Sequence, residues 1–271
     1  DRSMEIVKQI ITPYSGPIKF RIIAHDQNRG LSAARNTGIK NAIGEYLYFL
    51  DSDDEITPTA IENISYPIEN RDYDLVIGNY EITGKHQNIP ILKIADNTEL
   101  TDGSILETYA QNMWYMMAWN KLCRRTFIIE NSLFFEEGLI HEDDLWSFQI
   151  AVTAKSMFVV NKPCYLYRMR EGSIITHNKA ERNLSCRMIV DSKITAIISE
   201  KNLFKFKHVH NFINKLIVSH LNLIEYEKCR HLLKKYYYTI RRSHKESAYN
   251  ILLSNGFNMK RQLRDFHLLL P

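Results

Sequence analysis

The sequence predicts an α/β fold, in which a sheet carries helices on both faces and an α-helical extension follows it. Residues 46–50 form an uninterrupted run of bulky apolar and aromatic side chains, which is typical of a strand buried on both faces. Helical and extended patterns alternate around this run as far as residue 80, which favours right-handed crossovers and a parallel sheet. From Glu181 onward the pattern is helical alone, which indicates the extension.

The individual elements follow from local periodicity and from helix-breaking residues. Apolar residues at helical spacing, ended by Pro13, predict a first helix over residues 1–11. Further helices are expected over residues 31–43, 58–68 and 101–113, and strands over residues 18–25, 75–80, 156–161 and 164–168, the last two around Pro163. Residues 81–100 are expected to form an irregular connector with one short extended segment.

Three carboxylates, Asp51, Asp53 and Asp54, follow the apolar run directly. Ligands of open parallel sheets sit beyond the carboxyl ends of the strands, and neighbouring carboxylates repel one another unless a cation neutralises them. The pattern therefore predicts a site for a hard divalent ion, which prefers oxygen ligands. A solvated turn, a helix cap and a phosphatase-type nucleophile are the alternatives, whereas Ile56 stands where an EF-hand loop needs glycine.

Residues 28–38 read N-R-G-L-S-A-A-R-N-T-G, and G-E-Y follows at 44–46, before the acids. These motifs resemble the family 2 glycosyltransferases of GT-A fold, whose pattern is an N-x-G-x-x-x-A-R-N-x-G helix, a G-E-Y strand and a D-x-D-D turn. The resemblance covers residues 20–60 in register and continues more weakly to about residue 175. It implies a Rossmann-like, nucleotide-diphospho-sugar transferase domain over residues 1–178, with a basic α-helical extension over residues 179–271.

The resemblance also implies roles for particular residues. Asp51 and Asp53 would hold Mn²⁺ or Mg²⁺, and the donor nucleotide with its phosphates would face Asn28, Arg35, Asn36 and Asp51. An E-D pair at a helix start supplies the base in the family, which implies Asp143 as the base and Glu142 beside it on the acceptor side. Pure helix capping is the alternative for these acids, since carboxylates favour a helix N-terminus.

Two further segments match the family's pattern. Trp119 and Asn120, in the sequence W-N-K-L, are candidates for the acceptor side, although core packing is the commoner role of such residues. Residues 167–177 resemble a mobile loop that folds over the donor, in which Arg168 and Arg170 would contact phosphate oxygens. His177 in the same loop is a candidate third metal ligand.

The family's sheet begins with strands that grip the nucleotide base. This sequence opens at Asp1-Arg2-Ser3, which resembles the end of the family's D-D-G-S-x-D-x-S motif. We therefore expect further N-terminal strands that precede these 271 residues. The resemblance implies transfer of a sugar, with inversion, from a UDP-linked donor to a hydroxyl acceptor on a glycan or lipid-linked glycan in cell-surface polysaccharide synthesis. A catalytically inactive nucleotide-sugar-binding module is the alternative, and a metal-dependent hydrolase is the third choice.

Composition limits the location and the partners. The four cysteines are far apart and form no CxxC pair, so we expect free thiols in a reducing cytoplasm. No apolar run approaches the 18 residues of a membrane span. Residues 181–271 hold 17 Lys and Arg against 7 Asp and Glu, which favours a solvated face or peripheral contact with the anionic inner face of a membrane. Nucleic acid is disfavoured, because no recognised binding motif accompanies the charge.

Overall fold

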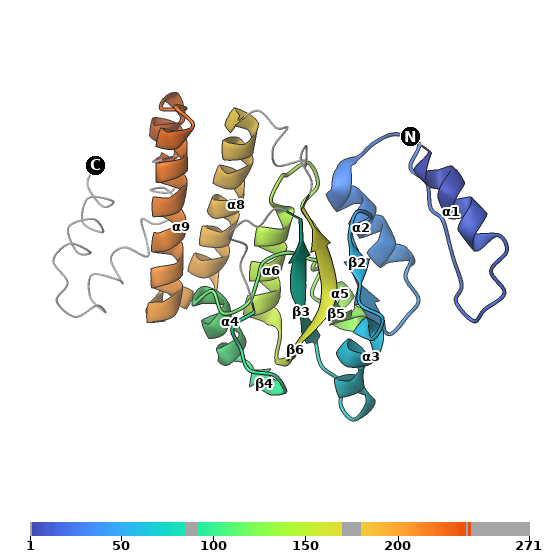
Figure 1. Ribbon diagram of the computed structural model, residues 1–271. Coiled ribbons are helices and arrows are strands. Elements are labelled where there is room, and N and C mark those ends of the chain that lie inside the picture. Colours follow the sequence, from blue (N-terminus) through green and yellow to red (C-terminus); the bar gives the residue numbers. More distant parts are fainter. Residues whose placement is uncertain (1, 85–91, 170–179, 237, 240–271) are drawn as a thin grey trace.

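The computed structural model describes residues 2–84, 92–169, 180–236 and 238–239. Figure 1 shows a central sheet with helices packed around it, helices α8 and α9 upright at one end of the molecule and α1 at the other. The described sheet has six strands in the order β1-β5-β3-β6-β2, and β4 pairs with β6. The α/β class predicted from the sequence is confirmed.

The elements have the following bounds. The strands are β1 (Tyr46–Tyr48), β2 (Glu55–Ile56), β3 (Leu75–Thr83), β4 (Thr98–Thr101), β5 (Lys121–Arg124) and β6 (Ser156–Arg168). The helices are α1 (Ser3–Ile11), α2 (Gly30–Asn41), α3 (Ala60–Ser65), α4 (Gly103–Ala110), α5 (Arg125–Glu130), α6 (Glu142–Thr153), α8 (Ala180–Glu200) and α9 (Lys207–Tyr226), with 3₁₀ turns η1 (Tyr66–Glu69) and η2 (Leu203–Lys205).

The sheet is mixed, which corrects the prediction of a parallel sheet. Among the described strands only β3 and β6 pair in parallel, and β5 runs antiparallel to both of its neighbours, β1 and β3. The apolar run does form a strand, but the predicted burial on both faces is wrong, because β1 lies at the edge of the described sheet and Leu50 is exposed. Burial and direction both depend on which elements become a strand's neighbours. Here the four-residue strand β5, which local periodicity did not reveal, separates β1 from β3.

The predicted strand over residues 18–25 is wrong for this structure. The segment is extended but unpaired with any described strand, and its side chains Ile18, Phe20 and Ile22 are exposed. Helix α1 forms as predicted and likewise buries no residue. A strand needs a neighbour for its backbone hydrogen bonds, and an alternating sequence pattern cannot supply one.

The two strands predicted around Pro163 form one continuous strand, β6. Its register against β3 shifts around Gly78 and Asn79, where Pro163 lies opposite Asn79. Proline has no N–H for the ladder, so a bulge is where a strand tolerates it. The predicted helices form with shorter bounds, as α2, α4 and α3, the last continued by η1, whose start contains Pro67. Strand β4 is the short extended segment expected within residues 81–100.

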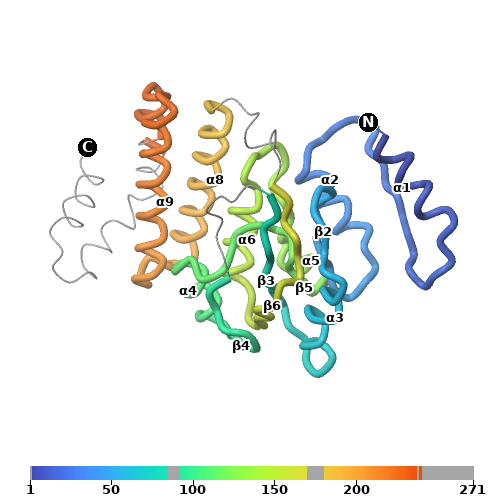
Figure 2. The backbone as a smooth tube through the Cα atoms, viewed as in Figure 1, coloured from blue at the N-terminus to red at the C-terminus, as the bar shows by residue number. Residues whose placement is uncertain are grey.

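The hydrophobic core continues from the sheet into the C-terminal helices. Trp146 of α6 belongs to the same buried cluster as Val190 and Ile194 of α8 and Val209 and Ile213 of α9. In the backbone trace of Figure 2, α6 lies between the sheet and these two upright helices. Helices α8 and α9 therefore share the core of the sheet, and a second buried cluster, which includes Met188 of α8 and Ile224 of α9, packs between them.

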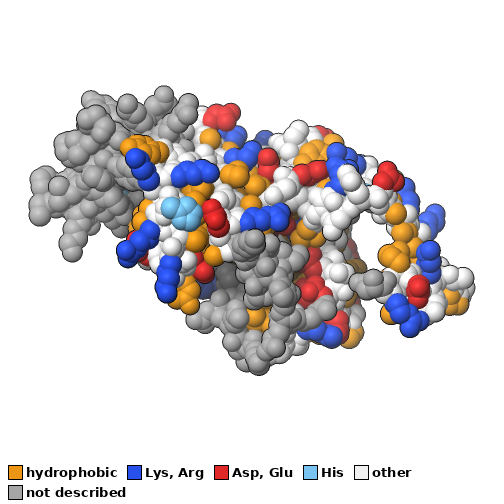
Figure 3. All heavy atoms as spheres, turned by 90° about the horizontal axis from the view of Figure 1, so that it is seen from above, with side chains coloured by type: hydrophobic (Ala, Val, Ile, Leu, Met, Phe, Trp, Pro, Cys, Tyr) orange, Lys and Arg blue, Asp and Glu red, His pale blue; other side chains and the backbone are white. Residues whose placement is uncertain are grey.

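Two expectations from composition can be compared with the structure. All four cysteines are free thiols, and Cys123, Cys164 and Cys186 are buried, as predicted. Within the described ranges, no helix is both long enough and apolar enough to cross a membrane. On the face drawn in Figure 3, Lys and Arg side chains lie both at the end of the molecule that carries α9 and at the end that carries α1.

Candidate active site

Arg35 on α2 joins two of the predicted site elements. Its guanidinium donates to Asp51 Oδ1 at 2.8 Å and to Glu142 Oε1 at 3.0 Å, and it lies 5.2 Å from the centre of the Phe135 ring. The Arg35 side chain is only 8% exposed. A buried cation is tolerated where carboxylates compensate its charge. The contact brings the turn after β1 and the start of α6 to the same place, although they are about ninety residues apart in sequence.

The acids after β1 form a tight turn that is fixed from β6. The Asp54 N–H donates to the Asp51 carbonyl at 3.1 Å. The Tyr165 hydroxyl accepts from the Asp51 N–H at 3.2 Å and donates to Asp54 Oδ2 at 2.7 Å, and the Arg168 N–H donates to Asp54 Oδ1 at 2.8 Å. Burial raises the pKa of Asp54, which the Arg168 N–H partly offsets. Asp54 therefore holds the turn, and Asp51 and exposed Asp53 face outward.

The chemistry of this turn suits a divalent ion that also binds phosphate. Asp51 is 27% exposed and Asp53 is exposed, so solvent reaches both side chains. The described residues contain no group of three or more His, Cys, Asp or Glu side chains that could hold a metal ion. Mg²⁺ characteristically takes one or two carboxylates and completes its shell with water and substrate phosphates. His177 and Arg170, the other predicted ligands in this region, lie outside the described residues.

The start of α6 gathers three acids, and the charges of Arg35, Lys121 and Arg187 act on them. Asp143 lies between Glu142, which pairs with Arg35, and Asp144, whose Oδ2 is 3.9 Å from Arg187 Nη1 on α8. Burial raises the pKa of Asp143, while the charges of Arg35 and Lys121 oppose the rise. Burial and then the charge of Asp143 raise the pKa of Asp144 as well. Both aspartates therefore bind a proton more readily than an exposed carboxyl group does.

Lys121 was not singled out from the sequence, although it follows Trp119 and Asn120 directly. Its side chain is fully buried, its ammonium donates to the Met117 carbonyl, and it lies 4.4 Å from the centre of the Tyr115 ring. Burial lowers the pKa of Lys121 to about 7. A sequence signal would have been a lysine inside an otherwise apolar and aromatic segment.

Trp119 and Asn120 lie behind the turn. The Trp119 ring stacks on Tyr165, with centroids 4.4 Å apart and planes 6° from parallel. Asn120 accepts from the Tyr48 hydroxyl at 3.0 Å and donates to the Asn79 carbonyl at 2.9 Å. Because both side chains are buried, they support the site from inside and have no open face toward an acceptor.

The side chain of Asn36 also forms its hydrogen bonds within the protein. Its amide donates to the Phe135 carbonyl and accepts from the Phe135 N–H, both at 2.8 Å. This pair of bonds fixes the Phe135 ring beneath Arg35. Arg168 is exposed and pairs with Glu55 at the rim of the turn.

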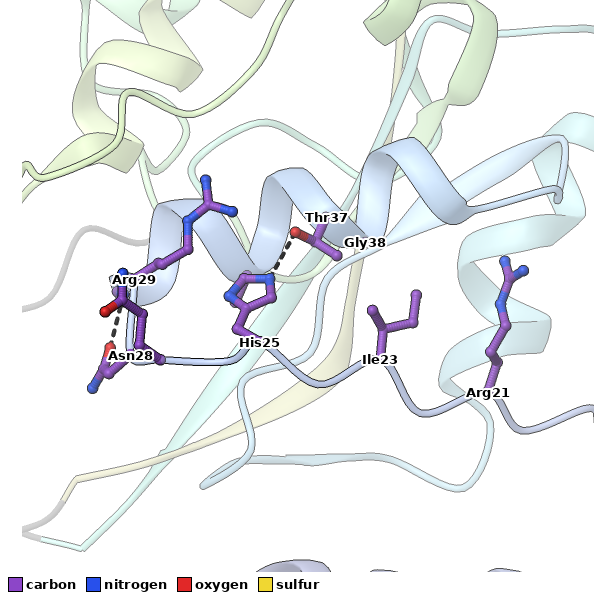
Figure 4. Close-up of a pocket in the computed structure, with 10 residues that line it drawn as sticks. Arg21, Ile23, His25, Asn28, Arg29, Thr37 and Gly38 are labelled. Carbon is purple, nitrogen blue, oxygen red and sulfur yellow. Dashed lines mark hydrogen bonds between the residues drawn. The ribbon is translucent and has the colours of Figure 1, made fainter.

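Asn28 lies in a different hollow from Arg35 and Asp51. It lines a cavity of about 490 Å³ in front of α2, where its Oδ1 accepts from the Gly30 N–H at 2.8 Å. Figure 4 shows Asn28 and Arg29 at the start of α2 and His25 against Thr37, whose Oγ1 is 2.8 Å from His25 Nε2. Arg35 and Asp51 line a second cavity of about 450 Å³ on α2. Asn28 and the carboxylate turn therefore line different cavities.

Comparisons with known proteins find a family for the part of the chain that carries this site. The profile of the family described as Glycosyl transferase family 2 matches residues 1–130. These residues belong to glycosyltransferase family 2. The chain is 28% identical over 225 residues to the uncharacterized glycosyltransferase YibD of Escherichia coli K12, across 80% of this chain and 62% of YibD. It is 26% identical over 193 residues to the poly(ribitol-phosphate) β-N-acetylglucosaminyltransferase TarP of Staphylococcus aureus N315, across 70% of this chain and 55% of TarP.

A solved structure confirms the GT-A fold of this family 2 chain. Residues 1–349 of Staphylococcus aureus TarS, crystallised in complex with UDP-GlcNAc, align with a TM-score of 0.71 at 18% identity, over 90% of this chain and 69% of the TarS chain. At 18% sequence identity, this structural similarity supports the fold alone. The chain spans 62% and 55% of the length of the two curated relatives named above.

Proposed function

We propose that this family 2 glycosyltransferase transfers a sugar from a UDP-linked donor to a hydroxyl group of a glycan or lipid-linked glycan, with inversion at the anomeric carbon. The observation that carries the proposal is the bridge from Arg35 to Asp51 and Glu142. Through this bridge, the Asp51 carboxylate, which could bind a metal ion together with the donor diphosphate, lies near the acids at the start of α6, which could accept a proton. UDP-GlcNAc is the first donor to test, because TarS was crystallised with it.

On the donor side, Asp51 and Asp53 would hold Mn²⁺ or Mg²⁺, which when bound neutralises charge on the leaving diphosphate. Arg35 donates to Asp51 Oδ1, so it orients that carboxylate and leaves the second oxygen for the ion. Arg168, at the rim of the same turn, is placed to contact phosphate oxygens. Asn36 holds Phe135 beneath Arg35, so we now assign it a supporting role in place of direct donor contact.

On the acceptor side, Asp143 would be the base. The acceptor oxygen attacks the anomeric carbon and its proton passes to the Asp143 carboxylate, while the bond to the UDP oxygen breaks on the opposite face of the sugar. A base is most effective when its pKa lies near the working pH. Burial shifts the pKa of Asp143 in that direction, and Arg35 and Lys121 keep it ionisable.

The proposal is tested by donor binding and donor turnover. UDP-GlcNAc should raise the melting temperature more in Mn²⁺ than in EDTA, because the ion links the donor to the turn. Asp53→Ala should abolish that metal-dependent gain, whereas Glu62→Ala, which removes an exposed acid on α3, should keep it. Metal-independent stabilisation by every UDP-sugar would argue against the turn as the metal site. Donor cleavage that no acceptor accelerates would indicate a hydrolase, and binding without any cleavage would indicate a binding module.

A further inference from the structure

His141, the residue before α6, adopts a backbone conformation that few side chains accept. Its φ is 67° and its ψ is 33°, in the left-handed region. Histidine visits this region more readily than most residues, but glycine is the residue that occupies it without steric cost. The chain therefore enters α6, which carries Asp143 two residues later, through a conformation that surrounding contacts must hold.

One of these contacts comes from α8. His141 Nε2 lies 2.6 Å from Asn183 Oδ1. An amide oxygen can only accept, so the Nε2 proton of His141 points at Asn183. Burial, followed by the charge of Arg187, lowers the pKa of His141 to about 4, so the ring is neutral at physiological pH and donates this single bond.

A second contact comes from the next turn of the same helix. Arg187 stands four residues after Asn183, so the two side chains share one face of α8. Its Nη1 lies 3.9 Å from Asp144 Oδ2, on the first turn of α6. Figure 1 shows α8 standing between α6 and α9, and α8 contacts both of them. Asn183 and Arg187 therefore reach the chain on either side of Asp143.

Arg187 is itself fixed by a buried polar chain that extends to α9. Its Nη1 donates to His220 Nε2 at 3.3 Å, so His220 carries its proton on Nδ1 and donates it to Asp191 Oδ2. The Tyr236 hydroxyl donates to the same Asp191 oxygen at 2.6 Å. Asp191, His220 and Tyr236 are all buried, so α8 and α9 hold the guanidinium in place.

We propose that α8 is a brace for the proposed base, in which Asn183 and Arg187 are positioning residues that hold His141 and Asp144 and thereby aim Asp143. The inference rests on the proposed function for the role of Asp143. The proposal gives the basic extension a role in positioning Asp143. The composition of the extension did not indicate this role. The extension would then be needed for turnover even where it does not touch the donor.

The first test separates positioning from binding. Asn183→Leu keeps the side-chain shape but removes the hydrogen-bond acceptor, and Arg187→Met removes the cation. Each should lower kcat by about 10- to 100-fold, since small displacements of a reacting group carry losses of that order. The KM for the donor should change by less than about twofold, because donor contacts lie on the other side of Arg35. Asn183→Asp, which keeps an acceptor oxygen, should retain most of the activity.

Lys193→Met is the matched control on α8, because it breaks an exposed pair with Glu136 at 3.2 Å and should leave kcat as in wild type. His141→Gly gives a rescue test. Glycine takes the left-handed conformation without help, so Asn183→Leu should lower kcat less in the His141→Gly background than in wild type. Equal losses in both backgrounds, or wild-type kcat in both Asn183→Leu and Arg187→Met, would overturn the brace.

A readout independent of turnover completes the test. In ¹³C-aspartate NMR spectra, with Asp144→Asn for assignment, Arg187→Met should move the titration of Asp144 to higher pH and Lys193→Met should not. An unmoved titration would refute the contact whatever the kinetics show. If wild-type protein turns over no donor, the proposed function fails, and the titration still decides whether α8 controls the acids of α6.

Discussion

The two halves of the candidate site are held by different kinds of interaction. The turn from Asp51 to Asp54 receives one charged contact, from Arg35 to Asp51, and is otherwise fixed by neutral donors, the hydroxyl of Tyr165 and a backbone N–H of β6. The start of α6 is fixed mainly by charges, with Glu142 on Arg35 and Asp144 facing Arg187. Hydrogen bonds between fixed groups set geometry, whereas clustered buried charges also set pKa values. The metal turn should therefore respond to the loss of single hydroxyls, and the start of α6 to changes in pH.

The largest effect is expected at the base. Asp143→Asn keeps the shape of the side chain but makes it a far poorer proton acceptor, so kcat should fall by roughly 10²–10⁴-fold with donor affinity nearly intact. Steady-state kinetics together with calorimetric titration of UDP would measure both quantities. Normal turnover in this variant would move the role of base to Glu142 or Asp144.

A smaller effect is expected at the metal turn, where two tyrosines of β6 form a matched pair. Tyr165→Phe removes the hydroxyl that holds Asp51 and Asp54, and Tyr167→Phe removes a hydroxyl from the other ring stacked on Trp119. Loss of one well-placed hydrogen bond is worth about 1 kcal/mol, so Tyr165→Phe should weaken Mn²⁺-dependent UDP binding by roughly fivefold or more. Equal weakening in Tyr167→Phe would mean that the stack, and not the hydroxyl, fixes the turn.

The charged groups at the start of α6 should affect how the free energy of unfolding depends on pH. The pKa of Asp144 is raised in the folded protein, so the folded state holds a proton that the unfolded chain releases above its ordinary pKa of about 4. Stability from this group is present at low pH and is lost as pH rises toward the folded pKa. Asp144→Asn should therefore flatten the fall in the free energy of unfolding between about pH 5 and pH 8. Parallel curves for wild type and variant, from urea unfolding at each pH, would contradict the shift.

The smallest effect concerns the basic extension, for which we propose peripheral contact with an anionic membrane. Lys234 and Lys235 are exposed, and a lysine near an anionic surface contributes about 1 kcal/mol that salt weakens. Reversal of both to Glu should reduce sedimentation with anionic liposomes at low salt and leave donor turnover unchanged. Arg241 and Arg242, the other basic residues of this prediction, lie outside the described residues. Equal binding to neutral and anionic liposomes would leave the basic extension as a solvated helical packing element.

The local sequence was enough to predict several parts of the site. The apolar run ended by Asp51 and Asp53 predicted a strand and a carboxylate turn, and both form. The strand is not buried on both faces as predicted, because β1 is a three-residue strand at the edge of the described sheet in which only Leu47 is buried. Helix α2 and the acids at the start of α6 were also predicted, because helix periodicity and the preference of acids for helix N-termini are local properties. Family membership followed from the order and spacing of these motifs.

The partners of each side chain were decided only by the tertiary structure. No local pattern distinguishes Arg35, which bridges two carboxylates, from Asn36 beside it, which holds a backbone segment about a hundred residues away. The same applies to Trp119 and Asn120, which lie behind the turn, and to Tyr165, which fixes it. Strand direction and the separation of β1 from β3 by β5 depended on distant pairing as well. Burial, hydrogen bonding and pKa shifts are properties of what surrounds a group, and most of those surroundings come from elements far away in the chain.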